Sequence, residues 1–348
     1  MTAVYPSPLG QQPRATRLPC DEAGPQVERH GPKVSVLMCV YNDEQFVSQA
    51  IESVLAQTYQ DFEFVIVDDG STDGTAAILA KYARTDRRIR ILSQANTGTT
   101  AAANFGLAQC RGVYVARLDS DDISLPHRLE VEVNFLDRHP DIALVGGGTE
   151  VIDVQGRAVG VRNIRASSPK RALRHRCIYQ QSDVMFRREV VLALGGYREK
   201  FHNAQDYDLW LRISEVAGIA KLTDILGQWR LNEGGYTLAR AKEQASEFTL
   251  IQRFAAQRSR NGSDQYATFV PPRPAGHRKP VSASQYDLRV GSVLLQALRL
   301  QEARAKIRSC LETDRSVYVS LLFLLTFLPK PVLSLLFSAT NLYLNNFD

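Results

Sequence analysis

The sequence predicts an α/β fold with a mostly parallel sheet flanked by helices, followed by a helical C-terminal appendage. Short apolar runs such as Val34–Val40 and Phe64–Val67 alternate with stretches that have helical apolar spacing. Paired aspartates follow two of these runs, and Pro, Arg, Gly and Ser become frequent after residue 258. Alternating strands and helices are typical of parallel sheets with helices on both faces.

The first four strands are predicted from continuous apolar runs, which are typical of strands buried on both faces. They are Val34–Val40, Phe64–Val67, Ile89–Leu92 and Val113–Ala116. Helices are predicted between them at Phe46–Leu55, Ala76–Ala83 and Thr99–Gln109. Successive units of this kind connect through right-handed crossovers, so the four strands should run parallel.

The chain is expected to divide into three parts. Residues 1–33 form a flexible tail, 34–240 the α/β domain, and 241–348 a helical region with a linker at about 259–284. Within the domain the alternation loosens after residue 140, where a second half-sheet is expected. Its strands are Ala143–Val145, Val184–Phe186 and Ala220–Leu222, with helices at Lys170–Arg176, Arg188–Leu194 and Tyr207–Ser214.

The C-terminal region is unusually apolar. A basic amphipathic helix is predicted at Val293–Leu311, and an apolar tail follows at 317–344, interrupted by Pro329 and Pro331. A membrane-spanning helix needs about 20 consecutive apolar residues, and each half of the tail is shorter than that. Two interpretations stay open: a helix pair in the membrane interface, giving peripheral membrane contact, or a pair packed on protein.

Composition limits the partners and the compartment. The chain has 348 residues, 44% of them hydrophobic, and a formal net charge of +5, which is ordinary for a globular protein and predicts no nucleic-acid partner. Its five cysteines are scattered without a C-x-x-C pair, which favours a reducing compartment. Because residues 1–33 lack the apolar stretch of a secretory signal, we expect a cytoplasmic location, with the inner membrane face as the alternative.

A cluster of acidic residues follows the fourth predicted strand. Asp119, Asp121 and Asp122 lie where a parallel sheet binds its ligands. Neighbouring carboxylates supply oxygen ligands for a divalent cation, which commonly binds phosphates as well. Asp121 or Asp122 could instead cap the helix expected after Pro126. Three acids allow both roles, and which of Asp121 and Asp122 binds the metal stays open.

A second acidic pair, Asp68-Asp69, ends the second strand and is followed by Gly70. No G-x-G-x-x-G follows the first strand, which excludes a dinucleotide site of the usual kind. Asp68 could instead accept the imino hydrogen of a nucleobase. Asn96-Thr-Gly98 and Asn104-Phe-Gly106 flank Ala101–Ala103 of the Ala-rich helix, whose small face permits close approach to a ligand.

The helix predicted at Tyr207–Ser214 begins with Gln205-Asp206-Tyr207-Asp208. Asp206 at its first turn could stabilise the helix through the helix dipole, which contributes a few tenths of a kcal/mol. It could also act as a general base toward an acceptor hydroxyl. Both roles are compatible with its position.

Three stretches together resemble glycosyltransferase family 2, an inverting, nucleotide-sugar-using family with the Rossmann-like GT-A fold. They are VSVLMCVYNDEQFVSQAIESVLAQTYQDFEFVIVDDGSTDGT, NTGTTAAANFGLAQCRGVYVARLDSDD and GGYREKFHNAQDYDLWLRI. They occur in the family's order and cover Val34 to Arg230. The resemblance implies transfer of a sugar, from a donor expected to be UDP-linked, to a glycan, lipid-linked or other hydroxyl acceptor in cell-surface polysaccharide synthesis.

The resemblance also implies roles for individual residues. Val40, Tyr41, Asp43 and Asp68 would form the nucleoside pocket; Gly98, Asn104, Asp119 and Ser120 would contact the donor; Asp119 and Asp121 would bind Mn²⁺ or Mg²⁺; Asp206 would be the catalytic base; and Gly195, Gly196, Tyr197 and Gln205 would form the acceptor side. The metal would stabilise the departing nucleoside diphosphate, so a single displacement would need no separate acid.

The chain departs from the family's pattern at three places. Gln205 stands where the family often has Glu, Asn232 where many members have the His of Arg-x-His, and Ala103 where some have Arg. Two alternatives follow: a haloacid dehalogenase-like phosphohydrolase with Asp119 as nucleophile, or a catalytically degenerate nucleotide-sugar binder. The first would need a downstream lysine and acidic motif, of which the sequence shows no convincing set.

Overall fold

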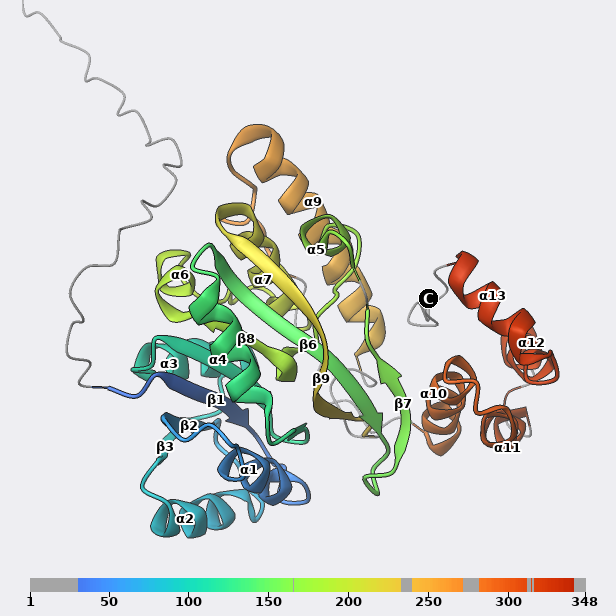
Figure 1. The fold of residues 1–348 in the computed structure, drawn as a ribbon, viewed down its shortest axis with the longest axis horizontal. Coiled ribbons are helices and arrows are strands. Elements are labelled where there is room, and N and C mark those ends of the chain that lie inside the picture. Colours follow the sequence, from blue (N-terminus) through green and yellow to red (C-terminus); the bar gives the residue numbers. More distant parts are fainter. Residues whose placement is uncertain are drawn as a thin grey trace, which may run out of the picture.

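The computed structural model describes residues 31–164, 166–232, 240–271, 282–311, 314 and 316–340. Residues 1–30 of the tail predicted at 1–33, and the residues after 340, lie outside this part of the chain. Figure 1 shows a twisted sheet with helices on both faces, and a separate group of helices at the C-terminal end of the chain.

The first half of the domain matches the predicted alternation closely. Its elements are β1 (Val34–Val40), α1 (Val47–Leu55), β2 (Phe62–Asp68), α2 (Thr75–Thr85), β3 (Ile89–Ser93), α3 (Thr99–Gln109), β4 (Tyr114–Asp119), β5 (Ile123–Ser124) and α4 (Arg128–Arg138). The strands β1, β2, β3 and β4 pair in parallel, as predicted.

The second half adds longer strands than the sequence indicated. It contains β6 (Ile142–Ile152), β7 (Ala158–Arg162), α5 (Pro169–Leu173), the 3-10 helix η1 (Gln181–Asp183), β8 (Val184–Arg187), α6 (Arg188–Ala193), α7 (Gln205–Val216) and β9 (Gly218–Arg230). The strand order is β3-β2-β1-β4-β8-β6-β9-β5, with β7 paired to β6. Because β8 runs antiparallel to both β4 and β6, the whole sheet is mixed.

Two apolar cores cover the faces of the sheet. On one face Leu37 and Val65 pack with residues of α3, α6, α7 and α9 (Ala241–Asn261), including Ile251 and Phe254. On the other, Met38 and neighbouring strand residues pack against α1, α2 and α4. The helix α9 therefore shares the core of the α/β domain, although it follows residue 240. The division into parts at 33 and 240 stays a prediction.

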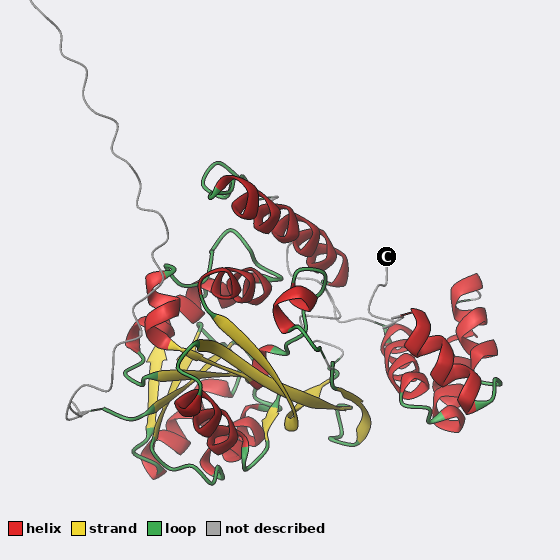
Figure 2. Cartoon of the chain, turned by 45° about the horizontal axis from the view of Figure 1, so that its top comes forward, coloured by secondary structure: helices red, strands yellow, loops and turns green. Residues whose placement is uncertain are grey.

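The C-terminal helices form a third cluster against one end of the sheet. They are α10 (Ala283–Gln296), α11 (Leu300–Leu311), α12 (Val317–Leu325) and α13 (Lys330–Thr340). Tyr286 and Val290 of α10 pack with Val151 and Val159 of β6 and β7, and Figure 2 shows the group standing beside the sheet. Among the described residues, no helix is both long and apolar enough to span a bilayer.

The single helix predicted at Val293–Leu311 is wrong. The chain turns between α10 and α11 at Leu298, whose φ is 57°, a left-handed conformation that interrupts a helix. The apolar tail does form two helices separated at Pro329, as its prolines indicated.

Candidate active site

The strand register brings the two acidic motifs to one edge of the sheet. Val40 at the end of β1 pairs with Asp68 of β2, and Cys39 pairs with Asp119 of β4. Asp68 and Asp119 therefore lie on either side of the end of β1. Ligands bind at the carboxyl ends of strands in such sheets. This edge is the candidate active site.

The first aspartate of the D-x-D sequence is oriented by the turn before β8. The side-chain amide of Gln181 donates to Asp119 Oδ1 at 2.7 Å, and the backbone N–H of Asp119 donates to Ser182 Oγ at 3.1 Å. These contacts exist because β8 is antiparallel to β4, so that β8 begins where β4 ends.

The third aspartate is a structural residue. Asp122 is 1% exposed, and its two carboxylate oxygens accept hydrogen bonds from Ser182 Oγ and from the backbone N–H of Arg230. The guanidinium of Arg230 also donates to the backbone carbonyl of Asp121 at 2.9 Å. Because protein donors occupy both of its oxygens, Asp122 fixes this turn.

Asp121 is half-buried beside two other carboxylates. Burial raises its pKa to about 7, and the charges of Asp43 and Asp119 add to this effect. Burial also raises the pKa of Asp43 to about 6, although Asp43 Oδ2 accepts a hydrogen bond from Ser120 Oγ at 2.6 Å. Carboxylates that crowd together in this way are stabilised by a bound cation.

Asp119 and Asp121 fit a divalent cation whose remaining coordination positions are filled by a bound substrate and water. In the described part of the chain, no group of three or more His, Cys, Asp and Glu side chains is arranged to hold a metal ion by itself. Asp119 and Asp121 would supply two oxygens, which is how Mg²⁺ is held when substrate phosphates and water complete its coordination. No hydrogen bond from another described residue occupies the Asp121 carboxylate.

The second acidic motif shapes the neighbouring loop. Asp69 accepts hydrogen bonds from the backbone N–H groups of Thr97 and Gly98, at 3.0 and 2.9 Å, and so holds this loop against the end of β2. Asp68 is 6% exposed, and its Oδ1 accepts from the N–H of Ser71. Gly70 has a φ of 78°, and a Cβ there would lie 2.8 Å from the Asn96 nitrogen, so the turn requires glycine.

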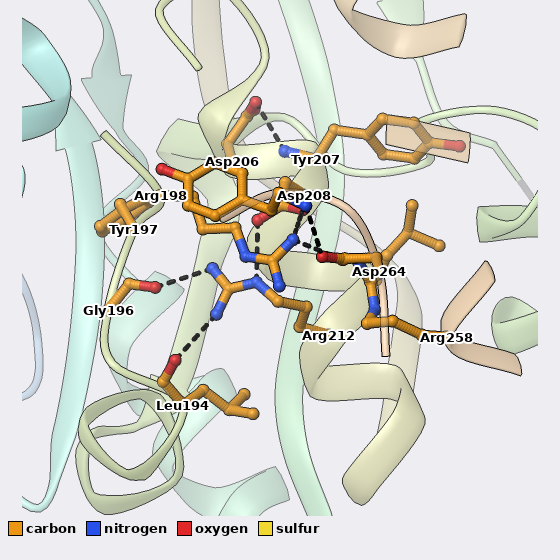
Figure 3. Close-up of polar contacts among 12 residues, drawn as sticks. Leu194, Gly196, Tyr197, Arg198, Asp206, Tyr207, Asp208, Arg212, Arg258 and Asp264 are labelled. Atoms are coloured by element: carbon orange, nitrogen blue, oxygen red, sulfur yellow. Dashed lines mark hydrogen bonds and ion pairs between the residues drawn. The ribbon is translucent and has the colours of Figure 1, made fainter. Parts of the chain in front are cut away.

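The expected acceptor side is a loop between α6 and α7. Asn104, predicted to contact the donor, uses its amide to hold this loop: its Oδ1 accepts from the N–H of Tyr197 and its Nδ2 donates to the Tyr197 carbonyl. Gly195 and Gly196 have φ values of 78° and 71°. From α7, Arg212 donates to the carbonyls of Leu194 and Gly196 at 3.0 and 2.7 Å (Figure 3).

The predicted base lies at the start of α7. Asp206 Oδ1 accepts from the N–H of Tyr207 at 2.7 Å, as Figure 3 shows. Burial raises the pKa of Asp206 to about 6; the Tyr207 N–H opposes this rise, and the charge of Asp119 adds to it. The two aspartates therefore interact electrostatically in the fold, although 86 other residues separate them in sequence.

A family model described as "Glycosyl transferase family 2" matches residues 35–192. The chain is also 38% identical over 192 residues to the "Putative glycosyltransferase EpsE" of Bacillus subtilis (strain 168), an alignment that covers 53% of this chain and 68% of that relative. The chain belongs to glycosyltransferase family 2. This membership makes the protein a glycosyltransferase and decides against the phosphohydrolase alternative.

Another family member has a similar extent of agreement. The "O-antigen biosynthesis glycosyltransferase WbnJ" of Escherichia coli is 33% identical over 182 residues, covering 52% of this glycosyltransferase and 71% of the relative. The family model itself ends before α7.

Solved structures resemble the glycosyltransferase in fold. The S. aureus TarS complex with UDP-GlcNAc has a TM-score of 0.51 at 20% identity, covering 79% of this chain and 88% of that chain. The mannosyltransferase PcManGT from Pyrobaculum calidifontis, in complex with GDP-Man and Mn²⁺, has a TM-score of 0.52 at 18% identity, covering 90% and 81%. At these identities the likeness establishes the fold, which is GT-A.

Sequence reasoning missed a buried cation of the glycosyltransferase site. Arg117 is 0% exposed, donates to the carbonyl of Leu37 at 3.0 Å, and has its Nη2 3.8 Å from Asp119 Oδ1. Within the described residues its Nε and Nη2 make no hydrogen bond. An arginine inside the otherwise apolar run Val113–Leu118 was the available signal, because a buried charge needs a nearby partner.

Gln181, Ser182 and Arg230 were also missed as supports of the D-x-D turn. The polar run Gln180-Gln181-Ser182-Asp183 directly before a buried strand was a visible signal for the first two. Arg230 was noted only for the missing histidine after it, and its contacts to Asp121 and Asp122 have no local signature.

Proposed function

We propose that this glycosyltransferase moves a sugar from a nucleotide-sugar donor, in the first instance a UDP-sugar, to a hydroxyl acceptor with inversion at the anomeric carbon. The observation that carries the proposal is the placement of Asp119 and Asp121 at the end of β4, with Asp206 at the start of α7 near enough for the charge of Asp119 to act on it. The O-antigen biosynthesis role in the name of WbnJ supports an acceptor in cell-surface polysaccharide synthesis.

The donor would lie across the ends of β1, β2 and β4. Val40, Tyr41, Asp43 and Asp68 would surround the nucleoside, and Gly98 and Ser120 would approach the ribose and diphosphate. Asn104 would act through the backbone of Tyr197, which it already holds. Mn²⁺ or Mg²⁺ on Asp119 and Asp121 would balance the charge of the diphosphate.

The acceptor would enter beside Gly195, Gly196, Tyr197 and Gln205. The carboxylate of Asp206 takes the proton of the acceptor hydroxyl, and the oxygen forms its bond to the anomeric carbon from the face opposite the diphosphate. The bond from this carbon to the diphosphate oxygen breaks, and the nucleoside diphosphate leaves with the electron pair. A single displacement of this kind inverts the configuration.

A panel of nucleotide sugars tests the proposal. UDP-glucose, UDP-galactose, UDP-N-acetylglucosamine and GDP-mannose are each added with Mn²⁺, and thermal shift and nucleoside diphosphate release are measured. We expect one donor to stabilise the protein and to be turned over, and EDTA to stop the turnover. Undiminished release in EDTA would contradict the metal role, and a panel without any binding would contradict the donor site.

We also propose that α12 and α13 contact the cytoplasmic face of a membrane. Leu321, Leu324 and Phe327 are 53%, 63% and 56% exposed, and Val332 and Leu336 are exposed as well. The exposed cations Arg308 and Lys330 lie in the same helical group. Apolar side chains with nearby positive charge favour an anionic lipid surface.

A further inference from the structure

The helix that carries Asp206 lacks a capping side chain of its own. The N-cap residue of α7 is Ala204, and no side chain of the cap residue accepts a hydrogen bond there. The first N–H groups of a helix have no partner within it and must be satisfied from elsewhere. Asp206 is in the first turn, and within the described residues its carboxylate accepts a hydrogen bond from the N–H of the adjacent Tyr207.

Glu247 of α9 supplies an acceptor for the N–H groups of the N-cap residue and of the two residues before it. Its Oε2 accepts from the backbone N–H groups of Asn203 and Ala204 at 2.8 and 3.0 Å, and both of its oxygens lie within 3.2 Å of the N–H of His202. Its Oε1 also accepts from the side-chain Nδ2 of Asn203 at 2.6 Å. One carboxylate thus binds three consecutive backbone N–H groups, which fixes the chain where α7 begins.

A second residue of the same turn of α9 completes the contact. Gln244 Nε2 donates to the carbonyl of Asn203 at 2.9 Å, so Gln244 and Glu247 hold the same peptide segment from both its donor and acceptor sides. The two residues are three apart and therefore share one face of α9. We call residues 202–204, held by Gln244 and Glu247, the α7 clamp.

The loop before the α7 clamp is fastened to the same part of the chain. Arg198 forms an ion pair with Asp264 at 2.6 Å, and Arg258 of α9 binds Asp264 as well (Figure 3). The ammonium group of Lys200 donates to the carbonyls of Tyr266, Ala267 and Phe269. The segment between Tyr197 and Asp206 therefore rests on α9 and the residues after it.

We propose that Glu247 is a positioning residue, which aims the Asp206 carboxylate by fixing the chain directly before α7. This inference rests on the proposed function, in which Asp206 is the base. The negative charge of Glu247 also lies at the positive end of the α7 dipole. Glu247 follows the family-model match, which ends at residue 192, and it makes 241–261 part of the catalytic unit.

The test compares Glu247→Ala and Glu247→Gln with Glu215→Gln in the full-length protein. Glu215 is a matched control because it joins α7 to α9 as well, through an ion pair with Arg258 at 2.8 Å, but at the opposite end of α7. Turnover is measured as nucleoside diphosphate release from the donor of the panel with saturating Mn²⁺. Donor dissociation constant, Tm and amide hydrogen exchange are measured on the same samples.

We expect Glu247→Ala to lower kcat roughly 10- to 100-fold, because small misplacement of a reacting group has effects of this size. The donor dissociation constant should stay within twofold, and exchange at residues 202–206 should accelerate. Glu247→Gln keeps one acceptor oxygen and should lie between Glu247→Ala and wild type. Glu215→Gln should keep its kcat within twofold at a comparable loss of Tm.

Three outcomes would overturn the inference: a kcat of Glu247→Ala within twofold of wild type, an equal loss of kcat in Glu215→Gln, or unchanged exchange at 202–206. Failure of the proposed function looks different, because wild-type protein would then release no nucleoside diphosphate. In that case the exchange data alone decide whether Glu247 fixes the start of α7.

Discussion

At the scale of single residues, the acidic motifs could be predicted from the sequence, but the different roles of their individual aspartates could not. Asp119, Asp121 and Asp122 all follow a buried strand, and nothing local distinguishes the last two. The distinction comes from Ser182 and from the backbone N–H of Arg230, which occupy both oxygens of Asp122. Contacts between residues 60 and 108 positions apart leave no pattern in a short stretch of sequence.

Asp121→Asn and Asp122→Asn should therefore fail in different ways. Asp121→Asn removes a metal ligand, and we expect kcat/KM to fall on the order of 100-fold with a higher Mn²⁺ requirement. Asp122→Asn turns an amide donor toward groups that already donate, and should cost about 1–3 kcal/mol of unfolding free energy. Mn²⁺ titrations of activity and chemical denaturation check both; the reverse pattern would exchange the two roles.

The pH dependence of transfer reports on Asp206. A general base must be ionised, so activity is lost as pH falls through the pKa of the base. Burial raises this pKa to about 6, above the ordinary value for aspartate of about 3.9, and the charge of Asp119 adds to the rise.

We expect kcat to fall on the acid side with a midpoint near pH 6, measured at saturating donor and Mn²⁺. Donor binding followed at each pH separates this loss from weaker metal binding at Asp121. A kcat that is constant down to pH 5 would contradict the assignment of Asp206.

At the scale of elements, apolar runs predicted the strands of the first half and underestimated those of the second. The strand β6 contains Gly146-Gly147-Gly148, which interrupts its apolar pattern and resembles a turn in sequence. These glycines are required by close packing, since a Cβ on Gly147 would lie 2.4 Å from the Leu226 side chain on β9. Propensity could not show this because the reason lies on another strand.

The loop between α6 and α7 offers a matched pair of glycine substitutions. Gly195 and Gly196 both have positive φ, so alanine at either site should cost about 1–2 kcal/mol of backbone strain. A Cβ on Gly195 meets nothing within 4 Å, whereas one on Gly196 would lie 2.6 Å from Asn104 Oδ1.

Gly196→Ala should therefore disturb the Asn104–Tyr197 contact and raise KM for the acceptor, while Gly195→Ala loses stability only. Steady-state kinetics and thermal denaturation of the two variants measure this difference. Equal acceptor KM values in both would contradict a role of this loop on the acceptor side.

At the scale of the whole molecule, the sequence indicated an α/β domain with helices after it, and the packing of those helices required the structure. The helix α9 joins the domain core through Ile251 and Phe254, and α10 covers one end of the sheet through Tyr286 and Val290. These are contacts between distant segments. The apolar tail, by contrast, was visible in the sequence because its apolar residues follow one another with few polar residues between them.

Membrane contact through α12 and α13 can be tested with acidic substitutions. Leu324→Glu combined with Phe327→Glu places charge on the exposed apolar surface and should abolish most co-flotation with vesicles of phosphatidylglycerol and phosphatidylethanolamine. Val161→Glu is the control, because Val161 on β7 is 59% exposed but lies outside these helices. Equal flotation of both variants and wild type would contradict the membrane contact.

Asp206→Asn is the sharpest test of whether Asp206 is the base of a donor site built on Asp119 and Asp121. Donor dissociation constant and nucleoside diphosphate release are measured side by side with Mn²⁺. We expect donor binding within a few-fold of wild type and a loss of turnover of roughly 100- to 10,000-fold. Turnover by Asp206→Asn at a near wild-type rate would contradict the role of Asp206 as the base.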